Sequence, residues 1–219
     1  EYKDISLALN TRGNKVIRTV ESPDGYFQVL DNFTERLDVD VSNNLGLIGA
    51  SEPPKTYGLY RDGNRITSLP KTRNYDDSYV NVSLSSAPYR LLSSPEVALI
   101  GSMGQFRIWE SLSLGASKVI ALEPNPGIFD LVRKHRALGT ENTYDEANVE
   151  LVGMRPAQLE STGRKFDLID ISPDLLDQSY TNRYAFTHEA IQSYFQILSD
   201  TGIISIPISI REFTVYAVK

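Results

Sequence analysis

The second half of the chain alternates short apolar runs with longer amphipathic segments, and this alternation constrains the fold more than any other feature. The apolar runs have strand length and the amphipathic segments have helical periodicity. The predicted strands are Val97–Ile100, Lys118–Leu122, Val149–Val152, Leu168–Ile171 and Gly202–Ile206, and the predicted helices are Phe106–Leu114, Ile128–His135 and Phe186–Leu198. Continuously apolar strands between helices favour a parallel sheet covered on both faces. We therefore expect a doubly wound α/β domain that binds ligands at the carboxyl ends of its strands.

The first part of the chain has the pattern of β-hairpins instead. Lys15–Glu21 and Tyr26–Asp31 flank a turn that contains Pro23 and Gly25, and Tyr57–Arg61 and Asn64–Thr67 flank Asp62-Gly63. Such Pro, Asp and Gly residues are typical of tight turns between strands. We divide the chain into an N-terminal β-hairpin region with a connecting helix, residues 1–92, and an α/β domain, residues 93–219.

Composition narrows the possible functions. The 219 residues carry a net charge of −6, which opposes binding to nucleic acid in the absence of a local basic patch. The chain has no cysteine and two histidines, so thiolate zinc sites and cysteine nucleophiles are excluded and we expect no metal. No apolar run reaches the roughly 20 residues that span a bilayer, so the chain is predicted to be soluble.

A glycine turn after the first predicted strand of the α/β domain is the best candidate for a ligand site. Gly101 and Gly104 follow the strand, and Glu123 ends the next strand about twenty residues later. Glycine allows close approach of the backbone to a ligand, and a strand-end carboxylate can accept hydrogen bonds from both hydroxyls of a ribose. The alternative is a tight turn followed by a solvated acid. The combined spacing favours nucleoside binding.

Met154 follows the third strand, where an acid could accept a hydrogen bond from an adenine amino group. A thioether can pack on an adenine face but is a weak acceptor. Met154 is therefore either a cofactor contact or an ordinary core residue.

An acid-rich loop follows the fourth strand. Asp174 is the first candidate for a base that takes a proton from a cationic amine, followed by Asp170 and Asp177. For each acid the alternative is a polar loop residue that caps the next helix. We assign no catalytic role to His135 or His188, which are predicted to lie near helix ends.

Several segments in a fixed order resemble one protein family. They are Tyr2–Leu9, Ser22–Val29, Tyr60–Gly63, Tyr79–Tyr89, Phe166–Ile169 and Tyr184–Ala190, in addition to the glycine turn. Together they resemble the spermidine synthase-like, or polyamine aminopropyltransferase-like, family of class I S-adenosylmethionine-fold transferases, above all its bacterial membrane-fused branch. The resemblance implies a Rossmann-like sheet of the class I methyltransferase type below an N-terminal β-hairpin region.

The resemblance also implies site roles. S-adenosylmethionine or its decarboxylated form would be the co-substrate, held by Gly101, Gly104, Glu123 and Met154. The acceptor would be a small-molecule amine such as a polyamine, with Asp174 and Asp170 as catalytic residues and Tyr79 and Asp177 as substrate-binding residues. The chain departs from the family pattern in the glycine turn, at Met154, in the motif Ser172-Pro173-Asp174, and at Asn81 and Ser85.

Three functions stay open at this point: an alkyl transferase acting on an amine, a small-molecule methyltransferase, and a binding or interaction module that has lost catalysis. A homodimer and a fusion to membrane segments outside this chain are both compatible with the sequence, and we expect a location on the cytoplasmic side. We also expect a C-terminally truncated domain, because the chain ends after the fifth predicted strand.

Overall fold

The computed structural model contains two sheets and describes residues 4–10, 13–31, 56–71, 76–101, 106–123, 125–133, 146–172 and 183–206. The strands are β1 Lys15–Ser22, β2 Gly25–Asp31, β3 Thr56–Arg61, β4 Asn64–Pro70, β5 Glu96–Ile100, β6 Lys118–Leu122, β7 Val149–Val152, β8 Phe166–Ile171 and β9 Leu198–Ser205. The α-helices are α1 Asp4–Leu9, α3 Ala87–Arg90, α4 Phe106–Ser113, α5 Pro126–Arg133, α6 Pro156–Glu160 and α7 His188–Ile197. Short 3-10 helices occur at η2 Ser78–Val82, η3 Leu84–Ser86 and η7 Arg183–Phe186.

The second half of the chain forms the predicted parallel sheet, with strand order β7-β6-β5-β8-β9. The order reverses between β5 and β8, which creates the switch point where doubly wound sheets bind ligands. The central strands β5, β6 and β8 are almost entirely buried, whereas β7 and β9 are only partly buried. This difference follows from position, because each outer strand has a described strand neighbour on one side alone. The predicted α/β fold class is confirmed.

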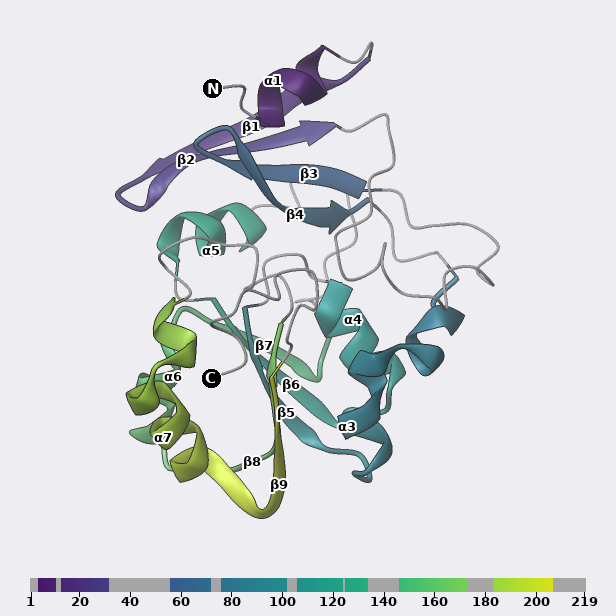
Figure 1. Ribbon diagram of the computed structural model, residues 1–219, viewed down its shortest axis with the longest axis vertical. Coiled ribbons are helices and arrows are strands. Elements are labelled where there is room, and N and C mark those ends of the chain that lie inside the picture. Colours follow the sequence, from purple (N-terminus) through teal and green to yellow (C-terminus); the bar gives the residue numbers. More distant parts are fainter. Residues whose placement is uncertain are drawn as a thin grey trace, which may run out of the picture.

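Alternate residues of the central strands face different helix layers. Val97 and Leu99 belong to one apolar cluster with Ile108 of α4, whereas Ala98 and Ile100 belong to another that includes residues of α5, α6 and α7. In Figure 1, α3 and α4 lie on one side of the parallel sheet, and α6 and α7 lie on the other. The period-two alternation of the strands therefore supplies apolar side chains to both faces.

The N-terminal strands form an antiparallel sheet in the order β1-β2-β3-β4, as the hairpin pattern predicts. Asp62 and Gly63 both have positive φ angles, 50° and 80°, which fits the left-handed two-residue turn expected of this dipeptide. One face of the sheet contacts α1 through Leu30 and Tyr60, while its other face joins the main core. Figure 1 shows this sheet above α5 and the parallel sheet below it.

The two sheets share one apolar core. Phe27, Val29 and Leu59 of the N-terminal sheet belong to the same buried cluster as Ile100 of β5 and Ile128 of α5. A Cβ atom built on Gly127 of α5 would lie only 2.7 Å from Ser22 Oγ and 2.8 Å from the Phe27 ring. The close seating of the N-terminal sheet on α5 therefore requires a residue without a side chain at position 127.

Some elements differ from the sequence prediction. The segment Tyr79–Tyr89, which the resemblance matches to the connecting helix, contains η2, η3 and the four-residue α3 instead of one continuous helix. Its serines explain the interruption, because Ser83 and Ser86 side chains donate to backbone carbonyl oxygens within the segment and compete with helical hydrogen bonds. The short helices α1 and α6 were not predicted, since six and five residues are too few for a clear periodic signal.

Candidate functional site

Gly101 lies directly after β5 at the switch point. Its φ angle is +83°, in a region that side chains other than glycine rarely adopt, and it is buried. Its backbone N–H donates to the Leu122 carbonyl at 3.2 Å, and the Ser172 N–H donates to the Ile100 carbonyl at 2.9 Å. These bonds bring the carboxyl ends of β5, β6 and β8 together. Gly104, the second glycine of the predicted turn, lies outside the described residues.

Glu123 follows β6 and is the most unusual side chain at this edge of the sheet. It is 3% exposed, and its Oε1 atom accepts a hydrogen bond from the Asn125 N–H at 3.0 Å. Its Oε2 atom is buried and has no hydrogen-bond partner among the described residues. Burial raises the pKa of Glu123 from 4.5 to about 8, and the Asn125 hydrogen bond opposes this rise. A buried polar atom without a partner marks a place where a ligand could bind.

Asn125 holds the turn that carries Glu123 into α5. Its Oδ1 atom accepts hydrogen bonds from the Gly127 and Ile128 N–H groups, at 2.9 and 3.2 Å. This is the capping geometry that satisfies free amides at a helix start, with Pro126 as the first helical residue. The cap fixes the backbone of Asn125, whose N–H points to Glu123. Sequence reasoning missed this role, although Asn before Pro at a helix start is a recognisable signal.

Met154 lies beyond β7, the next strand from Glu123 in the sheet. The Glu123 N–H donates to the Val152 carbonyl at 3.0 Å, so the ends of β6 and β7 are hydrogen-bonded. Met154 is partly buried and packs against the main apolar cluster. Gly153 lies beside the Phe129 ring of α5, which would be in ordinary van der Waals contact, at 3.4 Å, with an added Cβ atom. Met154 thus makes core contacts, and its contact with a cofactor stays a prediction.

Asp170 lies in β8, and its side chain joins the α4 side of the sheet. Its Oδ2 atom accepts hydrogen bonds from Arg107 Nε at 2.8 Å and Tyr89 Oη at 2.7 Å, and lies 2.7 Å from Arg107 Nη2. Asp170 is 1% exposed and Arg107 is 5% exposed. Burial and the Asp170 charge raise the pKa of Tyr89 well above its ordinary value. Asp170 is therefore part of a buried ion-pair network.

The same network includes the predicted substrate residue Tyr79. Tyr79 Oη donates to Glu110 Oε1 at 3.0 Å, and Arg107 Nη1 donates to Glu110 Oε2 at 3.0 Å. Arg107 Nη2 also donates to the Ser85 carbonyl at 2.9 Å. Arg107 and Glu110 lie one helical turn apart in α4, so their spacing alone is a sequence signal for this pair. Their partners from η2, η3, α3 and β8 could be found only in the folded chain.

The predicted site residues therefore divide into three groups. The structure brings Gly101, which follows β5 at the switch point, next to the end of β6, which Glu123 follows, and Met154 lies beyond the adjoining end of β7. It places Tyr79 and Asp170 in the buried network on the α4 side. Asp174 and Asp177, with the rest of the acid-rich loop after Ser172, lie outside the described residues, as does His135. His188 is exposed at the first position of α7.

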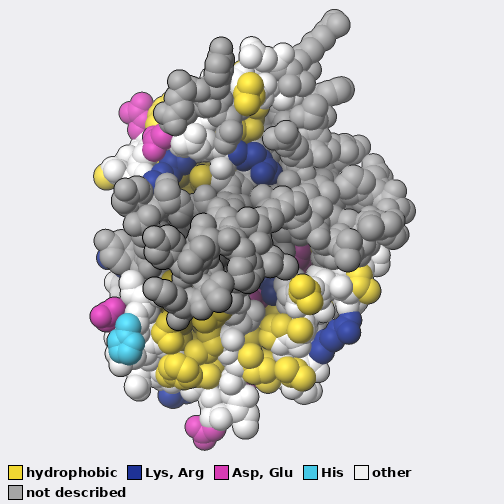
Figure 2. All heavy atoms as spheres, in the orientation of Figure 1, with side chains coloured by type: hydrophobic (Ala, Val, Ile, Leu, Met, Phe, Trp, Pro, Cys, Tyr) yellow, Lys and Arg dark blue, Asp and Glu magenta, His cyan; other side chains and the backbone are white. Residues whose placement is uncertain are grey.

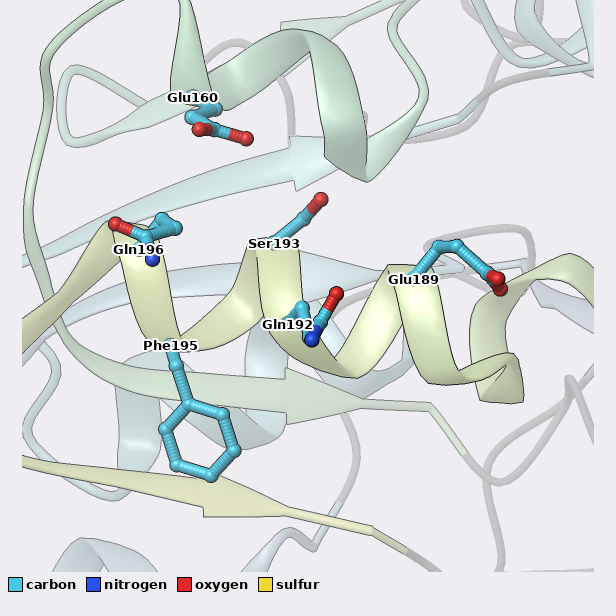
Figure 3. A pocket seen from close by; sticks show the side chains of 6 residues that line it. All are labelled: Glu160, Glu189, Gln192, Ser193, Phe195 and Gln196. Carbon is cyan, nitrogen blue, oxygen red and sulfur yellow. The ribbon is translucent and has the colours of Figure 1, made fainter.

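A separate surface hollow is lined by residues of α6 and α7. It has a volume of about 490 Å³ and is lined by Glu160, Glu189, Gln192, Ser193, Phe195 and Gln196. In Figure 3, Ser193 points toward α6 and Phe195 points to the opposite side of α7. Figure 2 shows apolar side chains gathered across the lower part of this face of the molecule. This hollow contains none of the predicted site residues.

Within the described ranges, no group of three His, Cys, Asp or Glu side chains could hold a metal ion. None of the helices that the structure describes is long and apolar enough to cross a membrane.

Comparisons with known proteins agree with the fold. No family model matches the chain, and no curated protein sequence matches it. Solved structures do match: spermidine synthase from Thermotoga maritima superposes with a TM-score of 0.58 at 19% identity, over 87% of this chain and 56% of that enzyme. A spermidine synthase in complex with the transition state analogue AdoDATO gives a TM-score of 0.57 at 19% identity, over 87% and 55% of the two chains.

The likeness is one of fold. At this identity it establishes a Rossmann-like sheet of the class I methyltransferase type with an antiparallel hairpin sheet, as predicted. The chain spans a little over half the length of these two enzymes. A ribosomal protein L11 methylase from Lactobacillus delbrueckii subsp. bulgaricus matches over 59% of this chain and 60% of its own, at 18% identity and a TM-score of 0.37.

Proposed function

We propose that this chain binds S-adenosylmethionine or its decarboxylated form and transfers an alkyl group from it to a small amine such as a polyamine. The observation that carries the proposal is the buried Oε2 atom of Glu123, which has no hydrogen-bond partner among the described residues. Leaving a buried polar atom unsatisfied costs about 1 to 3 kcal/mol. The two hydroxyls of a ribose would supply the missing donor.

The surroundings of Glu123 support a nucleoside at this place. Gly101 has a left-handed backbone at the switch point between β5 and β8, where doubly wound sheets bind their ligands. Gly104 and Met154 complete the proposed contacts. The two spermidine synthases share this fold, and one of them was solved with the transition state analogue AdoDATO.

The proposed reaction is a displacement at carbon. An adenosyl sulfonium compound supplies an electrophilic carbon beside its positive sulfur. A bond forms from the amine nitrogen to that carbon, the carbon–sulfur bond breaks, and the sulfur becomes a neutral thioether. The nitrogen must lose a proton before it attacks, and Asp174 is the proposed acceptor, with Asp177 binding the amine.

A second function is a nucleoside-binding module without catalysis. The positions of Tyr79 and Asp170 favour it, because their side chains are engaged by Glu110, Arg107 and Tyr89. If the acid-rich loop also provides no base, the nucleoside site would serve binding alone.

Calorimetric titration tests both candidates. We expect S-adenosylmethionine, its decarboxylated form or methylthioadenosine to bind, with at least a roughly tenfold weaker affinity in Glu123→Ala. Glu150→Ala is the matched control, because Glu150 lies in the adjacent strand β7 and pairs with Arg164 at 3.1 Å near the surface. Failure of all three compounds to bind the folded protein would contradict the proposal.

Product analysis then separates transfer from binding. A diamine is incubated with whichever sulfonium compound binds more tightly, and mass spectrometry should detect the transferred group. Preference for the decarboxylated compound predicts aminopropyl transfer, and preference for S-adenosylmethionine predicts methyl transfer. Asp174→Asn should abolish transfer with little change in nucleoside affinity. Tight binding with no product from any amine tested would favour the binding module.

A further inference from the structure

Glu123 combines three features that rarely occur together in one carboxyl group. It is 3% exposed, one oxygen accepts a single backbone hydrogen bond, and the other oxygen has no partner in the part of the chain that the structure describes. Burying an ionised carboxylate without a cation or several donors is strongly unfavourable. The geometry therefore favours the neutral acid over the carboxylate.

Charged side chains on the neighbouring elements are directed elsewhere. Asp130 and Arg133 of α5 are exposed, as is Arg155 beyond β7. Glu150 of β7 pairs with Arg164 at 3.1 Å and with Lys118, at the start of β6, at 3.6 Å. Among these described residues none pairs with Glu123.

We propose that Glu123 is a neutral carboxylic acid in the ligand-free protein and that a nucleoside diol displaces its proton on binding. This inference rests on the proposed nucleoside site and adds a coupling between ligand binding and proton release. The proton resides on Oε2, because Oε1 already accepts from the Asn125 N–H.

The exchange of donors explains the coupling. A neutral acid offers one O–H donor, whereas a ribose brings two O–H donors that need acceptors. An ionised carboxylate accepts both hydroxyls, and hydrogen bonds to a charged acceptor are stronger than those to a neutral one. The proton passes to the solvent buffer, so that one carboxylic acid and one diol become one carboxylate–diol pair and one free proton.

The coupling has a definite dependence on pH. Burial raises the pKa of Glu123 to about 8. As the pH rises toward that value, ligand affinity should therefore increase about tenfold per pH unit, and above it affinity should no longer depend on pH. At about pH 7 binding should release roughly 0.9 proton, and at about pH 9.5 close to none.

Calorimetry with methylthioadenosine measures the released proton. This nucleoside has no group that titrates near neutral pH, so any buffer dependence of the heat comes from the protein. Titrations in pairs of buffers with different ionisation enthalpies should give about 0.9 proton released at about pH 7 and close to none at about pH 9.5. Glu123→Gln, which has no proton to lose, should show no exchange at either pH.

The outcomes distinguish this inference from the proposed function. Binding without proton release at neutral pH overturns the inference and leaves the nucleoside site standing. No binding overturns both. A carbon-13 NMR titration of the glutamate side chains in the ligand-free protein, assigned with Glu123→Gln, provides an independent reading. A midpoint near pH 8 supports the neutral acid, and one below about pH 6 overturns it whatever the ligand does.

Discussion

Two buried carboxylates near the carboxyl edge of the parallel sheet have opposite environments. Asp170 of β8 and Glu123 at the end of β6 are 1% and 3% exposed. Oδ2 of Asp170 accepts hydrogen bonds from Arg107 and Tyr89, whereas Glu123 accepts one backbone hydrogen bond and keeps a buried oxygen without a described partner. Equal burial therefore does not mean an equal environment. Asp170 is held by two side-chain donors, whereas one Glu123 oxygen is left without a described partner, as the proposed nucleoside site requires.

Replacing Arg107 should have the largest effect, because it removes the cation that Asp170 and Glu110 share. We expect Arg107→Met to lower the free energy of unfolding by about 3 to 5 kcal/mol, since breaking a buried ion pair leaves its acids uncompensated. Urea unfolding followed by circular dichroism measures the loss. The control is Arg164→Met, whose pair with Glu150 is about 40% exposed and should contribute less than about 1 kcal/mol. Equal losses of unfolding free energy in the two variants would show that the buried ion pair of Asp170 stabilises the fold no more than an exposed pair does.

Replacing Glu123 should have a smaller effect that depends on pH. The folded pKa of Glu123, about 8, lies above its ordinary value of 4.5, so unfolding releases a proton between these values. The contribution of Glu123 to stability is present below pH 4.5 and falls as pH rises toward 8. Glu123→Gln removes this dependence. When the pH is raised from about 5.5 to 7.5, the free energy of unfolding of the variant should increase by about 2 to 3 kcal/mol relative to that of the original chain.

Urea unfolding of both proteins without ligand at several pH values measures that gap. A difference that stays constant across the range would mean that Glu123 is already ionised in the folded state. The comparison between the two carboxylates would then rest on hydrogen bonds alone.

Replacing Tyr89 should have the smallest effect of the three. Tyr89→Phe removes one donor to the charged Asp170, together with the 2.7 Å hydrogen bond between Tyr89 Oη and Ser111 Oγ, and should lower the free energy of unfolding by about 2 kcal/mol. Tyr194→Phe is the matched control, because Tyr194 Oη donates to the neutral Ala185 carbonyl at 2.9 Å and should contribute about 1 kcal/mol. A smaller loss for Tyr89→Phe than for Tyr194→Phe would show that Asp170 does not depend on its phenol donor.

Much of the fold could be predicted because its signals are local. The strands β6 and β7 have the predicted bounds, and β5 begins one residue before its predicted start. These strands were predictable because each is a short, mostly apolar run bounded by polar residues or glycine. The strand β9 begins four residues earlier than predicted, at Leu198. The predicted helix Phe186–Leu198 instead starts at His188, where Thr187 accepts a hydrogen bond from the Ala190 N–H. That capping threonine is a local signal for the helix start that the predicted range did not include.

The candidate site was predictable only in part. Gly101 and Glu123 were found because their spacing follows from one strand-helix-strand unit, in which the two strand ends must adjoin. Asn125 was missed although its signal is local. The catalytic role of Asp170 stays a prediction. Its side chain projects toward α4, because successive residues of a strand face opposite sides, and no sequence signal placed it beside Arg107.

The sequence by itself determined the parallel sheet, the N-terminal hairpins, and the meeting of Gly101 with Glu123, because these depend on periodicity and on residues close along the chain. Only the tertiary structure decided which buried acids have partners. Arg107 and Asp170 are 63 residues apart, and Tyr89 and Asp170 are 81 apart. Contacts across such separations depend on how α3, α4 and β8 pack. The same packing that encloses Glu123 gives it a single described backbone donor and sets its pKa.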